Sequence, residues 1–265
     1  IEEFMLIANE TVAEHFFWQE LPFVYRTHTP PEPDKIRKLT QFIRNFGYSV
    51  KGRGDEIHPK EIQKLLDSID GTPEEMMISR LTLRSMQRAE YNTQCLGHFG
   101  LACNYYCHFT SPIRRYPDLQ IHRIIKESLA GTLNERRILR YKGLLDEVAK
   151  QSTKMERRAD EAERECDKLK KAEYMLDHLG EQFEGVISSV TGWGLYVELP
   201  NTVEGLVHIS KLPGDFYVYH EELNEIKGEQ HGKRYVLGQK VTVSVDDANL
   251  AARTIDFSIV EKVNL

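Results

Sequence analysis

The chain has 265 residues, of which 29% are charged and 40% hydrophobic, and its formal net charge is −6. This composition is typical of a soluble protein with a buried core, and no run approaches the ~20 apolar residues that span a membrane. Residues 179–265 hold 7 Lys/Arg against 13 Asp/Glu, whereas the residues before them hold 28 of each. Neither part has the strong basic excess typical of nucleic-acid-binding proteins, so any such function must depend on local clusters.

The first predicted element is an amphipathic helix over IEEFMLIANETVAEHF that ends near Trp18, because its apolar residues recur at helical spacing. No capping residue precedes this helix, and the segment does not resemble a secretory signal. We therefore expect the chain to be part of a longer protein. The four cysteines form no C-x-x-C pair and no zinc pattern with histidine, which favours free thiols in a reducing cytoplasm.

Two further helices are predicted over residues 33–47 and 59–71, each with proline at its start and glycine at its end. A third follows, and on it Arg80, Arg84 and Arg88 are spaced i, i+4 and i+8, which places them on one helix face. The alternatives are a solvated face and a basic rim along a nucleic-acid channel, in which Arg84 contacts the nucleic acid.

Residues 89–116 are rich in aromatics, Cys, Gly and Thr, and we expect short strands and loops there. Pro117 then starts a helix that ends at Gly131, and two separate helices are predicted over residues 134–151 and 152–176. The last helix carries apolar residues that step by three or four, which predicts a packing stripe. The stripe consists of Met155, Ala159, Ala162, Cys166, Leu169, Ala172 and Leu176.

Glu156 has two interpretations. It follows Thr153 by three residues, the spacing of a capping box at a helix N-terminus. Alternatively, Glu156 is a functional carboxylate that faces Arg114 or a substrate hydroxyl.

From residue 180 the apolar period changes to two. Strands are expected over residues 181–190, 194–200, 204–210, 233–247 and 253–262. Five short strands in about 80 residues fit a small barrel of the OB type, with a domain boundary near residue 180. On this barrel Trp193, Tyr196 and His208 either stack bases or serve as ordinary structural residues.

The stretch HFTSPIRRYPDL, residues 108–119, combines guanidinium and hydroxyl donors that suit a phosphate. Arg114 and Arg115 supply the bidentate donors, and Thr110 and Ser111 supply the hydroxyls. Two prolines stiffen the loop, and the second stands at a helix start, where anions are favoured. The alternative is a structural loop whose hydroxyls cap the helix and whose arginines are solvated or pair with Asp118.

Several segments together resemble the ribonuclease II / ribonuclease R family. AEYNTQCLGHFGLACNYYCHFTSPIRRYPDLQIHRIIK resembles the family signature, STKMERRADEAERE its downstream helix, and IEEFMLIANETVAEHF a helix of its catalytic RNB domain. GEQFEGVISSVTGWGLYVELPNTVEGLVHIS is similar to an S1-type RNA-binding repeat. The signature and the repeat after it fit the ribonuclease R branch. The resemblance implies an α+β fold: a mostly helical, partial RNB catalytic domain over residues 1–179, followed by a five-stranded OB-fold β-barrel over residues 180–265.

The resemblance also implies a processive, hydrolytic 3′-to-5′ exoribonuclease of the cytoplasm that acts on single-stranded RNA 3′ ends and releases nucleoside 5′-monophosphates. It assigns the phosphate clamp to Arg114, a place near the active site to Glu156, and an RNA contact to Glu2 or Glu3. The RNA-facing positions that it implies in the barrel are Trp193, Tyr196, His208, Asp247 and Arg253. It further suggests the ribosome or the RNA-decay machinery as partners.

The family's aspartate cluster, which holds magnesium, matches no segment of this sequence. We therefore expect the Mg²⁺ ligands to lie outside the chain, and we expect the chain alone not to hydrolyse RNA. Two alternatives are a catalytically inactive RNA-binding adaptor of the same family and an OB module on an unrelated helical scaffold.

Overall fold

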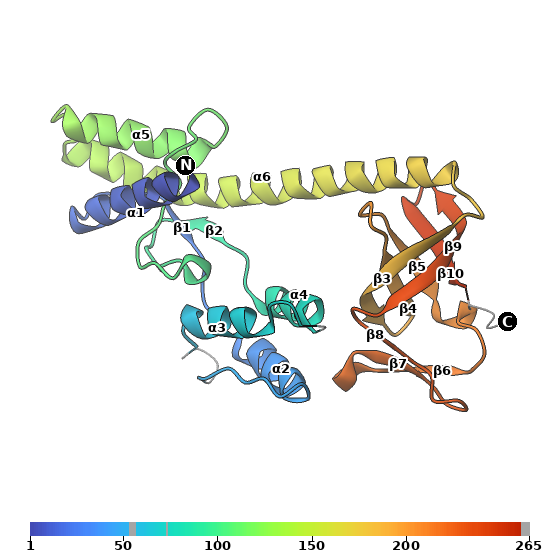
Figure 1. Cartoon of the computed structure of the whole chain (residues 1–265). Helices are drawn as coiled ribbons and strands as arrows, with labels where there is room; N and C mark the ends of the chain where they lie inside the picture. The colour runs from blue at the N-terminus through green and yellow to red at the C-terminus, as the bar shows by residue number, and fades with distance from the viewer. Residues whose placement is uncertain (53–56, 73, 261–265) are drawn as a thin grey trace. The chain divides into compact units, whose positions relative to one another are not determined.

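A computed structural model describes residues 1–52, 57–72 and 74–260 (Figure 1). The chain forms two compact units. The first comprises Ile1–Asp70 and Ser79–Ala159, and the second comprises Gly71–Ile78 and the residues from Asp160 onward. Among the described residues, no helix is both long enough and apolar enough to cross a membrane. The expected domain boundary near residue 180 stays a prediction.

Most of the first unit is helical. Its elements include α1 (Glu2–Trp18), α2 (Pro33–Arg44), α3 (Pro59–Ile69), the 3₁₀ helix η2 (Phe99–Leu101) and α5 (Tyr116–Leu129). The predicted end of the first helix at Trp18 is confirmed. Proline stands in the first turn of α2, α3 and α5, where its missing N–H costs no intrahelical hydrogen bond. Helix α4 (Glu75–Ser85) belongs partly to each unit.

A two-stranded antiparallel sheet joins distant parts of the first unit. It pairs β1 (Tyr25–Thr27) with β2 (Glu90–Asn92), and Arg26 lies opposite Tyr91. We did not predict β1, because three residues are too few to show a period of two. The sheet packs into a core with α1, α5 and the first half of α6, in which the Phe16 and Phe23 rings stack at 4.8 Å.

Helix α6 (Glu135–Leu176) is one continuous helix of 42 residues, so the two separate helices predicted over this span were wrong. No proline or glycine interrupts the junction, and Ser and Thr cost little in a helix interior. Thr153 is therefore not a helix N-cap, and the capping-box interpretation of Glu156 was wrong as well. Instead, the Thr153 Oγ1 accepts a hydrogen bond from the Tyr91 N–H at 2.9 Å.

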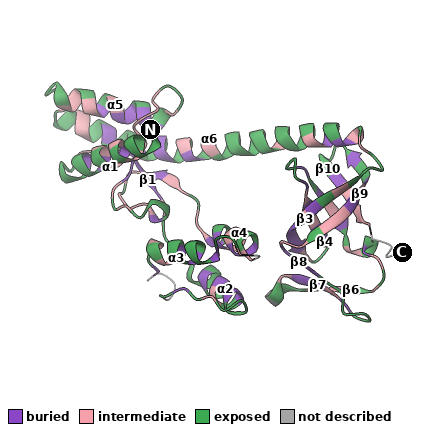
Figure 2. Ribbon diagram, viewed as in Figure 1, coloured by how far each residue is buried: buried purple, intermediate pink, exposed green. Residues whose placement is uncertain are grey.

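The predicted stripe on α6 is only partly a packing surface (Figure 2). Ala172 is fully buried and Leu176 half-buried. The other five positions are exposed, because they lie where the helix passes from one compact unit to the other. These exposed positions are Met155, Ala159, Ala162, Cys166 and Leu169.

The second unit contains a closed five-stranded barrel in the order β10-β5-β4-β3-β9, which confirms the predicted α+β fold and barrel. Its strands are β3 (Gln182–Thr191), β4 (Gly194–Glu198), β5 (Glu204–His208), β9 (Lys240–Asn249) and β10 (Thr254–Ile259). Inward side chains such as Leu195 and Phe257 are fully buried. Gly205 permits the close packing of Phe257, because a Cβ at position 205 would lie 2.5 Å from its ring.

A second sheet of the order β6-β7-β8 was not predicted. It consists of β6 (Tyr217–His220), β7 (Glu225–Gly228) and β8 (Arg234–Val236). The single strand expected over residues 233–247 was wrong, because this span contains β8 and β9, which belong to different sheets. Gly238, with φ of +87°, breaks the extended run between them.

Candidate active site and nucleic-acid interface

A buried carboxylate fixes the arginine loop, which we define as residues 108–115. The Oδ2 atom of Asp118, in the first turn of α5, accepts a hydrogen bond from the Ser111 N–H at 2.8 Å. The same oxygen accepts from the Arg115 Nε and Nη2 atoms at 3.1 and 2.8 Å. Asp118 is fully buried. Arg115 therefore holds the loop to the helix, which agrees with the structural alternative for this residue.

Arg114 differs from its neighbour, because its side chain is exposed. Its backbone N–H bonds to the Ser111 carbonyl at 3.3 Å, but no described residue forms a hydrogen bond or ion pair with its guanidinium. The guanidinium therefore projects from a fixed loop beside the N-terminus of α5, where an anion is favoured. Thr110 and Ser111 are half-buried in the same loop.

Glu156 pairs with Arg26, which the sequence analysis missed. The Glu156 Oε2 lies 2.7 Å from the Arg26 Nη1, and their side chains are 31% and 14% exposed. The Arg26 guanidinium carbon also lies 4.7 Å from the centre of the Tyr91 ring. Among the residues that the structure describes, no ion pair or hydrogen bond joins Glu156 to Arg114, which one interpretation placed opposite it. The single arginine within the otherwise mostly apolar stretch FVYRT could have indicated a buried ion pair, but the sequence did not identify its partner.

Histidines near this pair are held neutral. The Nδ1 atom of His108 is hydrogen-bonded to the Tyr91 hydroxyl at 2.9 Å. Burial, assisted by the positive charges of Arg115 and Arg26, lowers the pKa of His108 to about 3. Burial, and after it the electrostatic repulsion from His28, lowers the pKa of His98 to about 4. The positive charge of the site at neutral pH therefore comes from arginine.

The predicted basic helix face is only partly formed. Helix α4 ends at Ser85, so Arg88 lies beyond it and does not share a helix face with Arg80 and Arg84. The hydroxyl of Ser85 bonds back to the Leu81 carbonyl at 2.8 Å in the last turn. Arg84 is exposed and Arg80 half-buried, and both already interact with other groups.

The barrel presents an exposed aromatic pair. Trp193 is 54% exposed, and its Nε1 donates to the Tyr196 hydroxyl at 3.2 Å. Leu195 and Val197, which flank Tyr196 in β4, are fully buried, so Tyr196 points outward by strand alternation. The exposure of Trp193 rules out a core role for it. His208 is exposed and lies opposite Gly194 on the neighbouring strand.

Strand register extends this outer face across the barrel. Tyr196 lies opposite Leu206, Leu206 opposite Asp256, and Asp256 opposite Asp247. Asp247 is exposed and shares this row with Tyr196. Arg253, in the turn between β9 and β10 with φ of +56°, pairs with Glu165 of α6. A nucleic acid would therefore compete with Glu165 for Arg253.

Other predicted features lie apart from these groups. Glu2 and Glu3 are exposed in the first turn of α1. Among the residues that the structure describes, no three His, Cys, Asp or Glu side chains gather into a metal-binding group.

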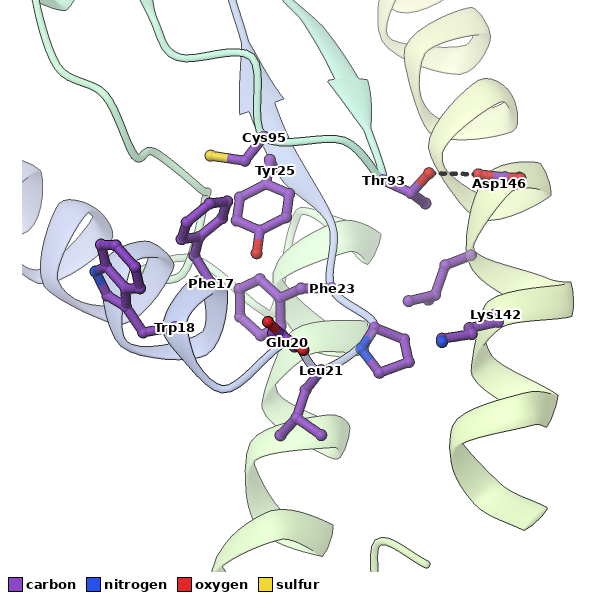
Figure 3. A pocket seen from close by; sticks show the side chains of 12 residues that line it. Phe17, Trp18, Glu20, Leu21, Phe23, Tyr25, Thr93, Cys95, Lys142 and Asp146 are labelled. Atoms are coloured by element: carbon purple, nitrogen blue, oxygen red, sulfur yellow. Dashed lines mark hydrogen bonds between the residues drawn. The ribbon is translucent and has the colours of Figure 1, made fainter. Parts of the chain in front are cut away.

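A cavity of about 650 Å³ occupies the first unit between aromatic residues and α6 (Figure 3). None of the predicted site residues lines this cavity. Tyr25 does line it, but Arg26, the next residue of β1, points to the opposite face of the strand. The cavity is thus separate from the Arg26–Glu156 pair.

Family models match both parts of the chain. The RNB domain matches residues 1–131, and the S1 RNA binding domain matches residues 177–260. Ribonuclease R 1 of Lactococcus lactis is 46% identical over 97% of this chain and 32% of its own length. Ribonuclease R of Aquifex aeolicus is 43% identical over 99% of this chain and 37% of its own length. The chain therefore spans about a third of the length of these curated relatives.

Solved structures show the same relationship. RNase R of Mycoplasma genitalium in complex with ribose methylated single-stranded RNA is similar with a TM-score of 0.91 and 26% identity. The match covers 98% of this chain and 41% of that one. Yeast Ssd1, a pseudonuclease, shares the fold with a TM-score of 0.66 and 22% identity over 85% of this chain and 28% of that one. On the RNB and S1 matches and these identities, the chain belongs to the RNB exoribonuclease family and, within it, to the ribonuclease R branch.

Proposed function

We propose that this chain is part of a Mg²⁺-dependent exoribonuclease that degrades single-stranded RNA processively from its 3′ end and releases nucleoside 5′-monophosphates. The observation that carries the proposal is Arg114, whose exposed guanidinium lacks a partner among the described residues on a loop fixed by a buried carboxylate. Identity of 46% to ribonuclease R 1 across nearly the whole chain supports it. The single-stranded RNA in the Mycoplasma genitalium complex supports the substrate class.

In this proposal the fixed arginine loop presents Arg114 to a backbone phosphate. A planar guanidinium can bind two phosphate oxygens and stabilise the charge that develops on them in the transition state. The hydrogen bonds from Ser111 and Arg115 to Asp118 fix the loop beforehand, so little ordering entropy is lost on binding. Glu156 is the second proposed site residue, as a carboxylate that accepts a hydrogen bond from a substrate hydroxyl.

The barrel is the proposed RNA-binding surface. Its acidic composition disfavours tight binding through phosphate charge alone, so stacking on Trp193 and Tyr196 is the main expected source of affinity. Stacking tolerates any base, which suits an enzyme that moves along a strand. Three further points stay predictions. They are a cytoplasmic location, the ribosome or the RNA-decay machinery as partners, and RNA contacts from Thr110, Arg84, His208, Asp247 and Arg253.

The described residues do not fit a Mg²⁺ site, because no three potential ligands among them gather together. We therefore propose that the magnesium ligands come from outside this chain.

Nucleotide release tests the proposal. The full-length enzyme should release nucleoside 5′-monophosphates from a 3′-tailed RNA in Mg²⁺ and should stop when the metal is chelated, while the 265-residue chain alone should release none. Blocking the 3′ end of the RNA should abolish degradation, whereas blocking the 5′ end should not. A full-length protein that binds RNA but never shortens it would favour the inactive adaptor, an alternative made concrete by the pseudonuclease that shares the fold.

A further inference from the structure

The contact between Arg26 and Glu156 leaves half of the carboxylate available. Arg26 Nη1 binds only Oε2, at 2.7 Å, and no described residue hydrogen-bonds to Oε1. The pair joins β1 to α6 across 130 positions of sequence. The carboxylate is thus held by one oxygen and can offer the other to a substrate.

Arg26 is itself firmly placed. Its backbone N–H donates to the Tyr106 carbonyl at 2.9 Å, and its guanidinium lies 4.7 Å from the centre of the Tyr91 ring, its register partner in β2. A guanidinium over an aromatic face is electrostatically favourable and limits the rotamers of both side chains. The arginine is therefore a fixed support for Glu156 and not a mobile surface charge.

Tyr91 connects this support to the arginine loop. Its hydroxyl is bonded at 2.9 Å to the Nδ1 of His108, the first residue of the loop. Its backbone N–H donates at 2.9 Å to Thr153, one helical turn before Glu156. The contacts run continuously from Glu156 through Arg26 and Tyr91 to His108.

A second ion pair in the first unit, between Arg137 and Glu127, differs from the Arg26–Glu156 pair in how many carboxylate oxygens it occupies. Arg137 donates to Glu127 and its guanidinium lies 5.6 Å from the Tyr141 ring, so the chemical groups match. Arg137 occupies both Glu127 oxygens, and the Tyr141 hydroxyl bonds to Oε1 at 2.9 Å as well. Glu127 has no oxygen left without a donor, whereas Glu156 keeps one.

We propose that Arg26 is a positioning residue that sets the Glu156 carboxylate relative to the arginine loop, with Tyr91 as the bridge between them. The inference rests on the proposed ribonuclease function. It assigns to Arg26 no contact with RNA. Its effect is on the rate of the reaction after RNA is bound, because it acts through Glu156.

Steady-state kinetics of the full-length enzyme on single-stranded RNA test this role. We expect Arg26→Met to lower kcat about tenfold while KM changes less than about twofold. Glu156→Gln should lower kcat by a similar factor, and the double variant should lower it no further, because both changes disrupt one unit. Arg26→Lys should restore part of the wild-type kcat. Tyr91→Phe, which removes only the hydroxyl that bonds to His108, should lower kcat by a smaller factor.

Arg137→Met is the matched control, since it breaks an ion pair of the same composition. It should lower thermal stability about as much as Arg26→Met and leave kcat unchanged at temperatures well below unfolding. Additive effects of Arg26→Met and Glu156→Gln, or equal losses of kcat in the Arg26 and Arg137 variants, would overturn the positioning role while leaving the ribonuclease function intact. An inactive wild-type enzyme would overturn both proposals, and the wild-type assay alone reveals that outcome.

Discussion

The arginine loop and the outer face of the barrel present their functional groups in different ways. In the loop, the Arg114 cation is exposed, while the buried Asp118 pairs with Arg115 and so fixes the loop. On the barrel, alternation along regular strands sets Tyr196 and Asp247 outward, and the Tyr196 hydroxyl bonds to Trp193, which is itself exposed. The difference suggests that the loop is built for one fixed geometry, whereas the barrel face tolerates a varied strand.

The largest expected effect comes from Arg114, because its guanidinium has no structural partner among the described residues. We expect Arg114→Ala in the full-length enzyme to lower kcat by about 10²–10³-fold, the usual cost of removing one transition-state donor. RNA affinity should fall only a few-fold. Single-turnover degradation and equilibrium binding of the same RNA measure the two quantities. Arg140→Ala, which removes another exposed arginine of the first unit, should change neither.

A large loss of affinity with unchanged kcat would show that Arg114 only holds RNA. The loop would then work as the barrel face does, and the contrast between the two regions would disappear.

Removing the loop's buried anchor should be the next largest effect. Asp118→Asn leaves Arg115, 18% exposed, without its ionic partner, and we expect the first unit to lose about 3 kcal/mol of unfolding free energy. The chain contains two tryptophans, and Trp18 belongs to the first unit. In a Trp193→Phe background, the fluorescence of Trp18 therefore follows urea unfolding of that unit alone. Asp146→Asn, a change to an exposed carboxylate, serves as the control. Equal stability of the Asp118 and Asp146 variants would contradict the anchor.

The sequence predicted the barrel more completely than it predicted the candidate site in the first unit. Alternating residues predicted β3, β4, β5 and β10 because each side chain faces either the core or the solvent, as Leu195 and Tyr196 do. The Arg114 loop was also recognisable, because its donors are adjacent in sequence. The pairing of Arg26 with Glu156 was not, since those residues lie 130 positions apart and only the folded sheet and helix bring them together. The continuity of α6 was missed because Ser and Thr suit a helix cap as well as an interior.

On the barrel we expect a moderate effect on binding and none on chemistry. Trp193→Ala should weaken binding of single-stranded RNA by about tenfold, within the range of one base–aromatic stack. The dependence of affinity on salt should not change, because no phosphate contact is lost. Trp18→Ala is the matched control, since Trp18 is 68% exposed in the other unit. Fluorescence anisotropy of labelled RNA measures both, and equal weakening by the two variants would argue against a stacking face on the barrel.

The smallest expected effect concerns Asp215, which braces the three-stranded sheet as Asp118 braces the loop. Its side chain is 1% exposed and accepts backbone N–H bonds from Phe216, Gln230 and His231. Burial alone would raise the pKa of Asp215, but these donors hold it below its ordinary value. A depressed pKa in the folded state adds stability above the unfolded pKa, and this stability is lost as pH falls through the folded pKa.

Asp215→Asn should therefore lower the melting temperature of the second unit by a few degrees at neutral pH and by less in acid, because the wild type loses the same stabilisation there. Trp193 fluorescence in a Trp18→Phe background reports this unit. Asp167→Asn, a change to an exposed carboxylate of the same unit, is the control and should not lower the melting temperature. If the loss of melting temperature stayed constant from neutral to acidic pH, the charge of Asp215 would contribute nothing to stability. The shape of the side chain alone would then hold the turn between β7 and β8. The brace of the three-stranded sheet at Asp215 would then differ in kind from the ionic anchor of the arginine loop at Asp118.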